Sequence, residues 1–189
     1  MNTKQKLVGM VLALLTSSAS FLLFVEKNEG LGPFQVVNNV RIYQAYPDPG
    51  LGWKLPTICA GHTKGVKRGD TATLEQCRKW LDEDTQWAKN RVAKCLSVPV
   101  TVSQFEALTS FEYNTGLFCS SQLRTYVNEN KCYLAANEFN NSPQIDKKTG
   151  QVKLQNGKVV MKFTTAGGIV LNGLVRRRTE ERRMFEKDC

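Results

Sequence analysis

Residues 45–63 read AYPDPGLGWKLPTICAGHT, and this stretch carries most of the information about the fold. Prolines and glycines at short intervals, mixed with aromatic and β-branched residues, are typical of short strands joined by turns. A similar composition extends over residues 30–72, so we expect a small β-rich lobe there. The same stretch holds Asp48 and the only histidine of the chain, His62, as polar groups that could serve a site.

Two capping boxes follow the β-rich stretch. TLEQ at 73–76 predicts a helix that begins after Thr73 and runs to about Val92. TVSQ at 101–104 repeats the pattern and predicts a second helix, which should end near Gly116 because glycine is the usual helix C-cap. Both segments are expected to be core helices rather than parts of a cofactor site.

The rest of the chain is predicted to be mainly helical. Residues QVKL and KVVMKF alternate on either side of Asn156-Gly157, a strong two-residue turn pattern, and predict a β-hairpin over 146–163. The fold class is therefore α+β, with a small β-rich lobe and a mainly helical lobe. The further helices are expected at 120–129, 131–140 and 172–187.

The net charge of +9 over 189 residues favours a polyanionic partner such as nucleic acid, an anionic membrane surface or a cell-wall polymer. A nucleic-acid-binding protein would interleave aromatic residues with its basic stretch, and RRRTEERR at 176–183 has none. Because acids alternate with bases in this run, we expect it to form a solvent-exposed helix face. No nucleic-acid partner is predicted.

The chain has six cysteines without any CxxC pair and only one histidine, so a zinc site is not expected and disulfides in an oxidising compartment are favoured. Cys59 lies two residues from Thr57, so a regulatory role for a disulfide at this position stays open. Sequence alone does not fix the connectivity. The pairs we expect are Cys59 with Cys77, Cys95 with Cys119, and Cys132 with Cys189.

An uncharged segment, residues 7–25, follows Lys4 and Lys6 and would span roughly 28 Å as a helix at about 1.5 Å per residue. This length is close to that of a bilayer core. Small and weakly polar residues dilute the segment, which predicts a weak, uncleaved anchor with the N-terminus in the cytoplasm. A cleavable signal peptide and a buried soluble helix are the alternatives. The domains are then a signal-anchor or signal peptide, 1–25, and a folded domain, 26–189.

Five blocks of the sequence, in order, resemble the phage-type lysozymes of glycoside hydrolase family 24, which include the T-even phage lysozyme. With the weak N-terminal anchor, the chain is similar to the signal-anchor-release subgroup of endolysins. The blocks are NEG (28–30), AYPDP (45–49), TICAGHT (57–63), QFEALTSFEYNTG (104–116), and AGG (166–168) with NGLVRRRTEERR (172–183).

The resemblance implies a lysozyme-like fold with a cleft between the two lobes and an N-terminal apolar helix. It implies hydrolysis of the β-1,4 bond between N-acetylmuramic acid and N-acetylglucosamine, which needs one carboxylic acid and one carboxylate. Carried over to this chain, Glu29 is the general acid, Asp48 the base or electrostatic partner, and Thr57 the group that positions water. The resemblance implies no metal and no organic cofactor.

The expected partners are peptidoglycan glycan strands and, through residues 7–25, the bacterial inner membrane. The chain is expected to be a monomer that is tethered to this membrane and then released into the periplasm. While the anchor spans the membrane, Glu29 is held at the bilayer and the cleft should be incomplete. Release would let FLLFVEKNEG, residues 21–30, pack as the first helix of the domain.

The spacing of the acids departs from that of the resembled family. Glu29 and Asp48 are nineteen positions apart, whereas the two carboxylates of the family are usually about nine apart. Glu26 is the other candidate for the acid, but Glu29 is preferred because a glycine follows it. The insertion GPFQVVNNVR, residues 32–41, is expected to form an extra hairpin that turns at Asn38-Asn39.

Two other functions are compatible with the sequence. A lytic transglycosylase would cut the same bond with a single acid and would not need Asp48. A non-catalytic peptidoglycan-binding module would bind the wall without cutting it. His62 is interpreted as a structural histidine that ties the β-rich lobe down, rather than as a catalyst or a metal ligand.

Overall fold

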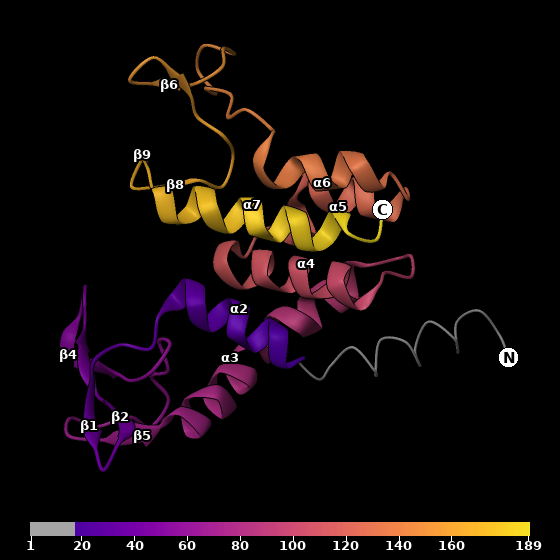
Figure 1. Ribbon diagram of the computed structural model, residues 1–189. Coiled ribbons are helices and arrows are strands. Elements are labelled where there is room, and N and C mark those ends of the chain that lie inside the picture. Colours follow the sequence, from indigo (N-terminus) through magenta and orange to yellow (C-terminus); the bar gives the residue numbers. More distant parts are fainter. Residues whose placement is uncertain (1–17) are drawn as a thin grey trace, which may run out of the picture. The chain divides into compact units, whose positions relative to one another are not determined.

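The computed structural model describes residues 18–189, whose path is drawn in Figure 1. These residues form two compact units, which we call the N-terminal unit (residues 18–86) and the C-terminal unit (residues 87–189). The predicted α+β class is confirmed, because helices dominate and the strands are short and antiparallel.

The N-terminal unit contains two small antiparallel sheets, which confirms the β-rich lobe predicted over 30–72. One sheet has the strand order β1-β2-β5, and β3 pairs with β4 in the other. The strands are β1 (Phe34–Val37), β2 (Val40–Gln44), β3 (Tyr46–Asp48), β4 (Gly52–Thr57) and β5 (Thr71–Thr73).

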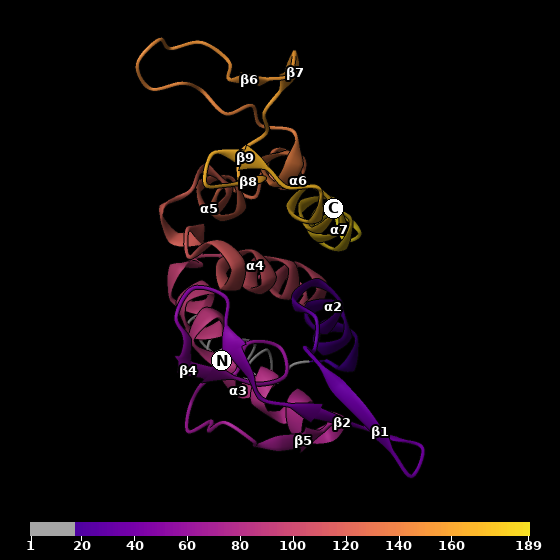
Figure 2. The same ribbon diagram turned by 90° about the vertical axis from the view of Figure 1, so that its left-hand side faces the viewer.

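The predicted extra hairpin is formed by β1 and β2, and Figure 2 shows it projecting from the end of its sheet. Its turn residues Asn38 and Asn39 have φ values of 49° and 61°. Two consecutive positive φ values define the tight turn that matches the twist of paired strands, and asparagine tolerates them well. The base of the hairpin is closed by a hydrogen bond of 2.9 Å from the Gln44 N–H to the Pro33 carbonyl.

Helix α2 (Ala19–Glu29) opens the described part of the chain. The Ser18 hydroxyl accepts a hydrogen bond of 3.1 Å from the Phe21 N–H and caps the helix, and Gly30 ends it with a φ of 75°. Phe21 and Val25 are fully buried. The first half of α2 is apolar as expected, but its last turn reads EKNE and is polar.

Helix α2 overlaps the segment that the sequence assigns to the membrane. It includes residues 19–25 of the predicted anchor and runs across the predicted domain boundary between residues 25 and 26. Residues 7–17 of the anchor lie outside the described residues. In the part of the chain that the structure describes, no helix is both long enough and apolar enough to span a membrane.

Helix α3 (Leu74–Cys95) begins where the first capping box predicts it. The Thr73 hydroxyl accepts a hydrogen bond of 3.2 Å from the Gln76 N–H, as an N-cap does. The helix extends three residues beyond the predicted end at Val92, because Val92 is itself buried in the core of the C-terminal unit.

The C-terminal unit is a bundle in which α7 packs along both α4 and α6 (Figure 1). Both hydrogen bonds of the second capping box are present between Thr101 and Gln104, and Gly116 ends α4 in the left-handed region. The predicted helices are all found. They are α4 (Val102–Thr115), α5 (Gln122–Asn128), α6 (Cys132–Asn140) and α7 (Asn172–Glu186), with a 3-10 turn η1 (Phe118–Ser120). Helix α4 lies between its predicted caps, and α5, α6 and α7 are each shorter than predicted by a residue or more.

Two short hairpins connect α6 to α7. The predicted one pairs β6 (Leu154–Gln155) with β7 (Lys158–Val159) through Asn156-Gly157, both with positive φ. A second hairpin, which the sequence analysis missed, pairs β8 (Thr165–Ala166) with β9 (Ile169–Val170). Its two turn residues are the glycines of the AGG block, and their φ values of 56° and 80° explain why glycine stands there.

Three of the eight residues of the basic run in α7 are buried, so the expectation of a solvent-exposed face is wrong for Arg177, Arg178 and Glu181. The Glu181 carboxylate lies 2.7 Å from Arg178 Nε and 3.2 Å from Arg177 Nε, and it accepts a hydrogen bond of 2.6 Å from the Ser110 hydroxyl. Burial raises the pKa of Glu181, while Arg178 and Arg177 act in the opposite direction. The partner that makes this burial possible, Ser110, comes from α4.

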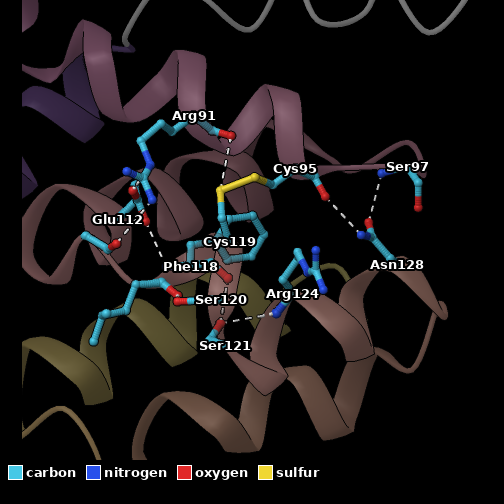
Figure 3. Close-up of a disulfide and its surroundings, with 12 residues drawn as sticks. Arg91, Cys95, Ser97, Glu112, Phe118, Cys119, Ser120, Ser121, Arg124 and Asn128 are labelled. Carbon is cyan, nitrogen blue, oxygen red and sulfur yellow. Dashed lines mark hydrogen bonds and ion pairs between the residues drawn. A yellow bond between two sulfur atoms is a disulfide. The ribbon is translucent and has the colours of Figure 1, made fainter.

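All three predicted disulfides are present, and they join Cys59 to Cys77, Cys95 to Cys119, and Cys132 to Cys189. Figure 3 shows how the second one is surrounded by polar contacts. Asn128 donates to the Cys95 carbonyl and accepts from the Ser97 N–H, both at 2.9 Å. The buried Glu112 pairs with Arg91 at 2.7 Å and accepts the Phe118 N–H at 2.7 Å, which anchors the chain just before Cys119.

Candidate active site

Asp48 and Thr57 lie on the two strands of the β3–β4 hairpin. Tyr46 pairs with Thr57 and Asp48 with Gly52, with a register shift between Pro47 and Asp48. Directly paired residues of antiparallel strands project from the same face of a sheet, so Tyr46 and Thr57 share a face. Thr57 is 4% exposed, and its hydroxyl donates to the Leu55 carbonyl at 3.2 Å.

The Asp48 carboxylate also shapes the turn that follows it. Its Oδ1 accepts two backbone hydrogen bonds of 2.8 Å, from the N–H groups of Gly50 and Leu51. This is the turn role that an aspartate between two prolines commonly has. The bonds fix the direction of the carboxylate while engaging only one of its two oxygens, so a turn role and a chemical role are compatible at this residue.

Glu29 is the last residue of α2, directly before the C-cap Gly30. The other candidate acid, Glu26, is held in an ion pair, with its Oε2 2.8 Å from Nε of Arg78. This charge-assisted bond already engages the Glu26 carboxylate. The ion pair argues against Glu26 as the acid, and the sequence prefers Glu29 because a glycine follows it.

Tyr46 lies on β3 two residues before Asp48, and the sequence analysis missed it. The pKa of the Tyr46 phenol is raised by burial first, and then by the negative charges of Asp48 and of Glu29. The Tyr46 hydroxyl itself donates to the Cys59 carbonyl at 3.2 Å. Its position two residues before Asp48 on a strand was the available clue, since such residues share a face.

The inserted hairpin accounts for most of the nineteen positions between Glu29 and Asp48. Residues 34–44 leave and return at the same point, because the Gln44 N–H bonds to the Pro33 carbonyl. Without these eleven residues the two acids would be eight positions apart, close to the spacing of about nine expected from the resembled family. The insertion is thus a side loop on the path between the two acids.

Gly32 lets the chain pass against the Tyr46 ring at this point. A Cβ atom on Gly32 would lie 2.5 Å from Tyr46 Cε1, and the φ of Gly32 is 69°. We predict that Gly32→Ala moves the ring and lowers the rate of the reaction at this site by about tenfold or more, since a misplacement of about 1 Å costs up to 10²-fold. The measurement is the rate of peptidoglycan clearing, together with the melting temperature.

Gly65→Ala is the matched control for that variant. Gly65 has a similar φ of 77° and nothing within 4 Å of the added Cβ, so it carries the backbone strain without the ring contact. The strain of a left-handed alanine is about 1–2 kcal/mol at either position. Equal losses of activity in Gly32→Ala and Gly65→Ala would show that the Tyr46 contact has no role.

His62 has the structural role that the sequence predicts. It is 5% exposed, its Nδ1 lies 2.9 Å from Asp84 Oδ2, and its Nε2 lies 3.1 Å from the Lys64 carbonyl. The imidazole stacks on the Trp80 ring with centroids 4.6 Å apart. These contacts tie the TICAGHT loop to α3, next to the disulfide between Cys59 and Cys77.

The described residues contain no group of three or more His, Cys, Asp or Glu side chains that could hold a metal ion. A pair of carboxylic side chains is the set of groups with which most glycoside hydrolases cut a glycosidic bond.

The comparisons with known sequences agree with one another on the family. The family model of phage lysozyme matches residues 41–157, a range that includes Asp48 and Thr57 and begins after Glu29. The endolysin of Bacillus phage B103 is 36% identical over 148 residues, which cover 77% of this chain and 47% of that protein. This chain thus spans about half the length of such relatives.

Two further proteins are similar over different extents. The SAR-endolysin of Pseudomonas phage phiKMV is 45% identical over 67 residues, 35% of this chain and 42% of that protein. Among solved structures, the muramidase domain of SpmX from Asticaccaulis excentricus aligns with a TM-score of 0.63 and 26% identity. That alignment covers 89% of this chain and 95% of the domain.

Proposed function

Because the chain belongs to the phage lysozyme family, we propose that it is an endolysin that hydrolyses the β-1,4 bond between N-acetylmuramic acid and N-acetylglucosamine in bacterial peptidoglycan. Glu29 protonates the leaving oxygen, Asp48 acts as the base or electrostatic partner, and Thr57 positions the water. The observation that carries this proposal is the closed base of the inserted hairpin, which leaves Glu29 and Asp48 only eight positions apart along the rest of the chain.

The sequence pattern and the local geometry support these roles together. Glu29 ends a helix beside Gly30, and the side loop 34–44 leaves it a short path to the hairpin that carries Asp48. The backbone bonds to Asp48 Oδ1 hold that carboxylate in place before substrate arrives, which is the preorganisation that a charge-stabilising group needs.

The direct test adds the full chain, collected from the periplasm in its released form, to cells whose outer membrane has been permeabilised. The proposed function predicts that turbidity falls as the wall is cut. A non-catalytic peptidoglycan-binding module would sediment with the walls without lowering the turbidity, and that result would reject an enzymatic role.

We also propose that the chain is held in the inner membrane by residues 7–25 and becomes active in the periplasm after release. Phe21 and Val25 belong to this apolar segment and are also buried side chains of α2. A side chain cannot lie in lipid and in the folded core at once, so the two states exclude each other. The likeness to a SAR-endolysin and the three disulfides, which suit an oxidising compartment, support the proposal.

A stronger anchor should therefore keep the enzyme inactive. Gly9→Leu with Thr16→Leu raises the apolarity of the segment at two positions ahead of α2, and Leu favours insertion by about 0.3–0.6 kcal/mol per residue. We predict that this variant stays in the membrane fraction and that lysis by expressing cells is lost. The control is Gly9→Ala with Thr16→Ser.

Full muramidase activity from the membrane-held variant would contradict control by release. Intact mass of the membrane-held and the released protein separates release from cleavage of a signal peptide. Equal masses are expected, whereas a released chain that begins near Ser20 would establish cleavage.

A further inference from the structure

A hollow of about 470 Å³, open to solvent, lies in the N-terminal unit between α2 and the β1–β2 hairpin. The inserted hairpin supplies one wall, so the insertion that sets this chain apart from the family's usual spacing also builds this feature. Its lining includes Glu26 and Lys27 from α2, Leu31 from the connection, and Phe34, Arg41 and Tyr43 from the hairpin.

One face of the hairpin is covered at its base and open toward its tip. Phe34 pairs with Tyr43 and Val36 with Arg41, so these four side chains share the face that lines the hollow. Along this face Tyr43 is 2% exposed, Phe34 45% and Val36 63%. The chain therefore leaves an apolar strip uncovered where the hollow opens.

The charges around the strip are positive. The Arg41 guanidinium lies over the Phe34 ring, 4.8 Å from its centroid, and Lys27 lies on the opposite wall. The one acid in the lining, Glu26, is paired with Arg78. No acidic residue occurs between Glu29 and Asp48. The hollow thus suits a ligand that carries carboxylates beside small apolar groups.

We propose that this hollow binds the peptide stem of peptidoglycan, the short carboxylate-bearing peptide attached to the lactyl group of N-acetylmuramic acid. A stem carboxylate lies beside Arg41, and apolar stem side chains lie against Phe34 and Leu31. The inference rests on the proposed function, and it is favoured by position, since Gly30 both lines the hollow and directly follows Glu29. A concave site suits an extended peptide better than it suits a bilayer surface.

Arg41→Gln tests the proposal because it removes the charge and keeps a polar side chain on the strand. The released full chain is assayed on stem-bearing glycan and on the same glycan stripped of its stems by an amidase. We expect the KM for stem-bearing glycan to rise about tenfold with kcat unchanged, the size of effect of one charge-assisted hydrogen bond. Inhibition by a synthetic stem peptide should weaken by a similar factor.

Arg68→Gln is the matched control, because the Arg68 guanidinium also stacks on an aromatic ring, that of Trp53, at 4.9 Å and outside the hollow. It should leave the KM for both glycans and the inhibition by stem peptide unchanged. Equal behaviour of Arg41→Gln and Arg68→Gln, with the wild type active, would overturn this inference and leave the proposed function standing.

An anionic lipid surface is the alternative partner for an apolar strip that lies beside cations. It predicts that Arg41→Gln weakens binding to phosphatidylglycerol vesicles more than Arg68→Gln does, with the KM unchanged, and this result would also overturn the stem site. A wild type that cuts neither glycan would instead reject the proposed function.

Discussion

Glu29→Gln is expected to lower the rate of peptidoglycan hydrolysis by about 10²–10⁴-fold, the range that general acid catalysis contributes. Glutamine has nearly the same size as glutamate but has no carboxyl proton to give to the leaving oxygen. Glu29 ends α2 at a helix terminus, so the substitution should leave the fold intact. The measurement is the initial rate of clearing of permeabilised cells, with an unchanged melting temperature as the check on folding.

Glu26→Gln is the internal control for this variant, three residues earlier on the same helix. It breaks the ion pair with Arg78, which is partly exposed and worth about 0–1 kcal/mol in stability. The rate of hydrolysis should stay within a small factor of the wild type. Activity that survives in Glu29→Gln, or that is lost only in Glu26→Gln, would contradict the assignment of the acid.

Asp48→Asn is expected to have the second large effect, a loss of about 10²-fold or more in rate. Asparagine keeps an oxygen that can accept the N–H groups of Gly50 and Leu51, so the turn should persist while the negative charge is lost. A fall in rate without a fall in melting temperature would therefore report on the reaction rather than on the fold.

Asp70→Asn is the matched control, because Asp70 also accepts a backbone N–H in a turn of the N-terminal unit, that of Lys67 at 2.7 Å. It should keep the wild-type rate. A lytic transglycosylase uses a single acid, so near-normal activity in Asp48→Asn would favour that reaction over hydrolysis.

Local patterns predicted most of the secondary structure, because the residues that cap and turn a chain act within a few positions. Thr101 and Gln104 form both bonds of their capping box, and Gly116 ends the same helix. The three expected disulfide pairs are present, although six cysteines permit fifteen connectivities and the sequence does not fix the choice among them. The β8–β9 hairpin was missed because its strands have only two residues each and show no alternation.

The burial of the charged side chains of α7 could not be predicted from the residues next to them in the sequence. The alternation in RRRTEERR is the same for an exposed face and for a buried cluster, and the difference depends on Ser110, which is distant in the chain. Glu181 is paired with Arg177 and Arg178 of its own helix, and Ser110 of α4 adds a hydrogen bond to the same buried cluster.

The sequence indicated which residues form the candidate site but not how these residues are arranged in space. Asp48 and Thr57 stand out by motif, and Glu29 by its glycine, but nothing local says how a nineteen-residue gap closes. That information lies in long-range contacts, namely the bond from Gln44 to Pro33 and the fit of Gly32 to the Tyr46 ring. The hollow beside the hairpin follows from the same closure.

The products of the reaction test the central claim most directly. Wild-type protein and Glu29→Gln are incubated with purified peptidoglycan, and the soluble fragments are examined by mass spectrometry before and after borohydride reduction. Hydrolysis through Glu29 predicts fragments that end in reducible N-acetylmuramic acid with the wild type, and almost none with Glu29→Gln. Fragments lighter by one water and resistant to reduction, or equal yields from the two proteins, would contradict it.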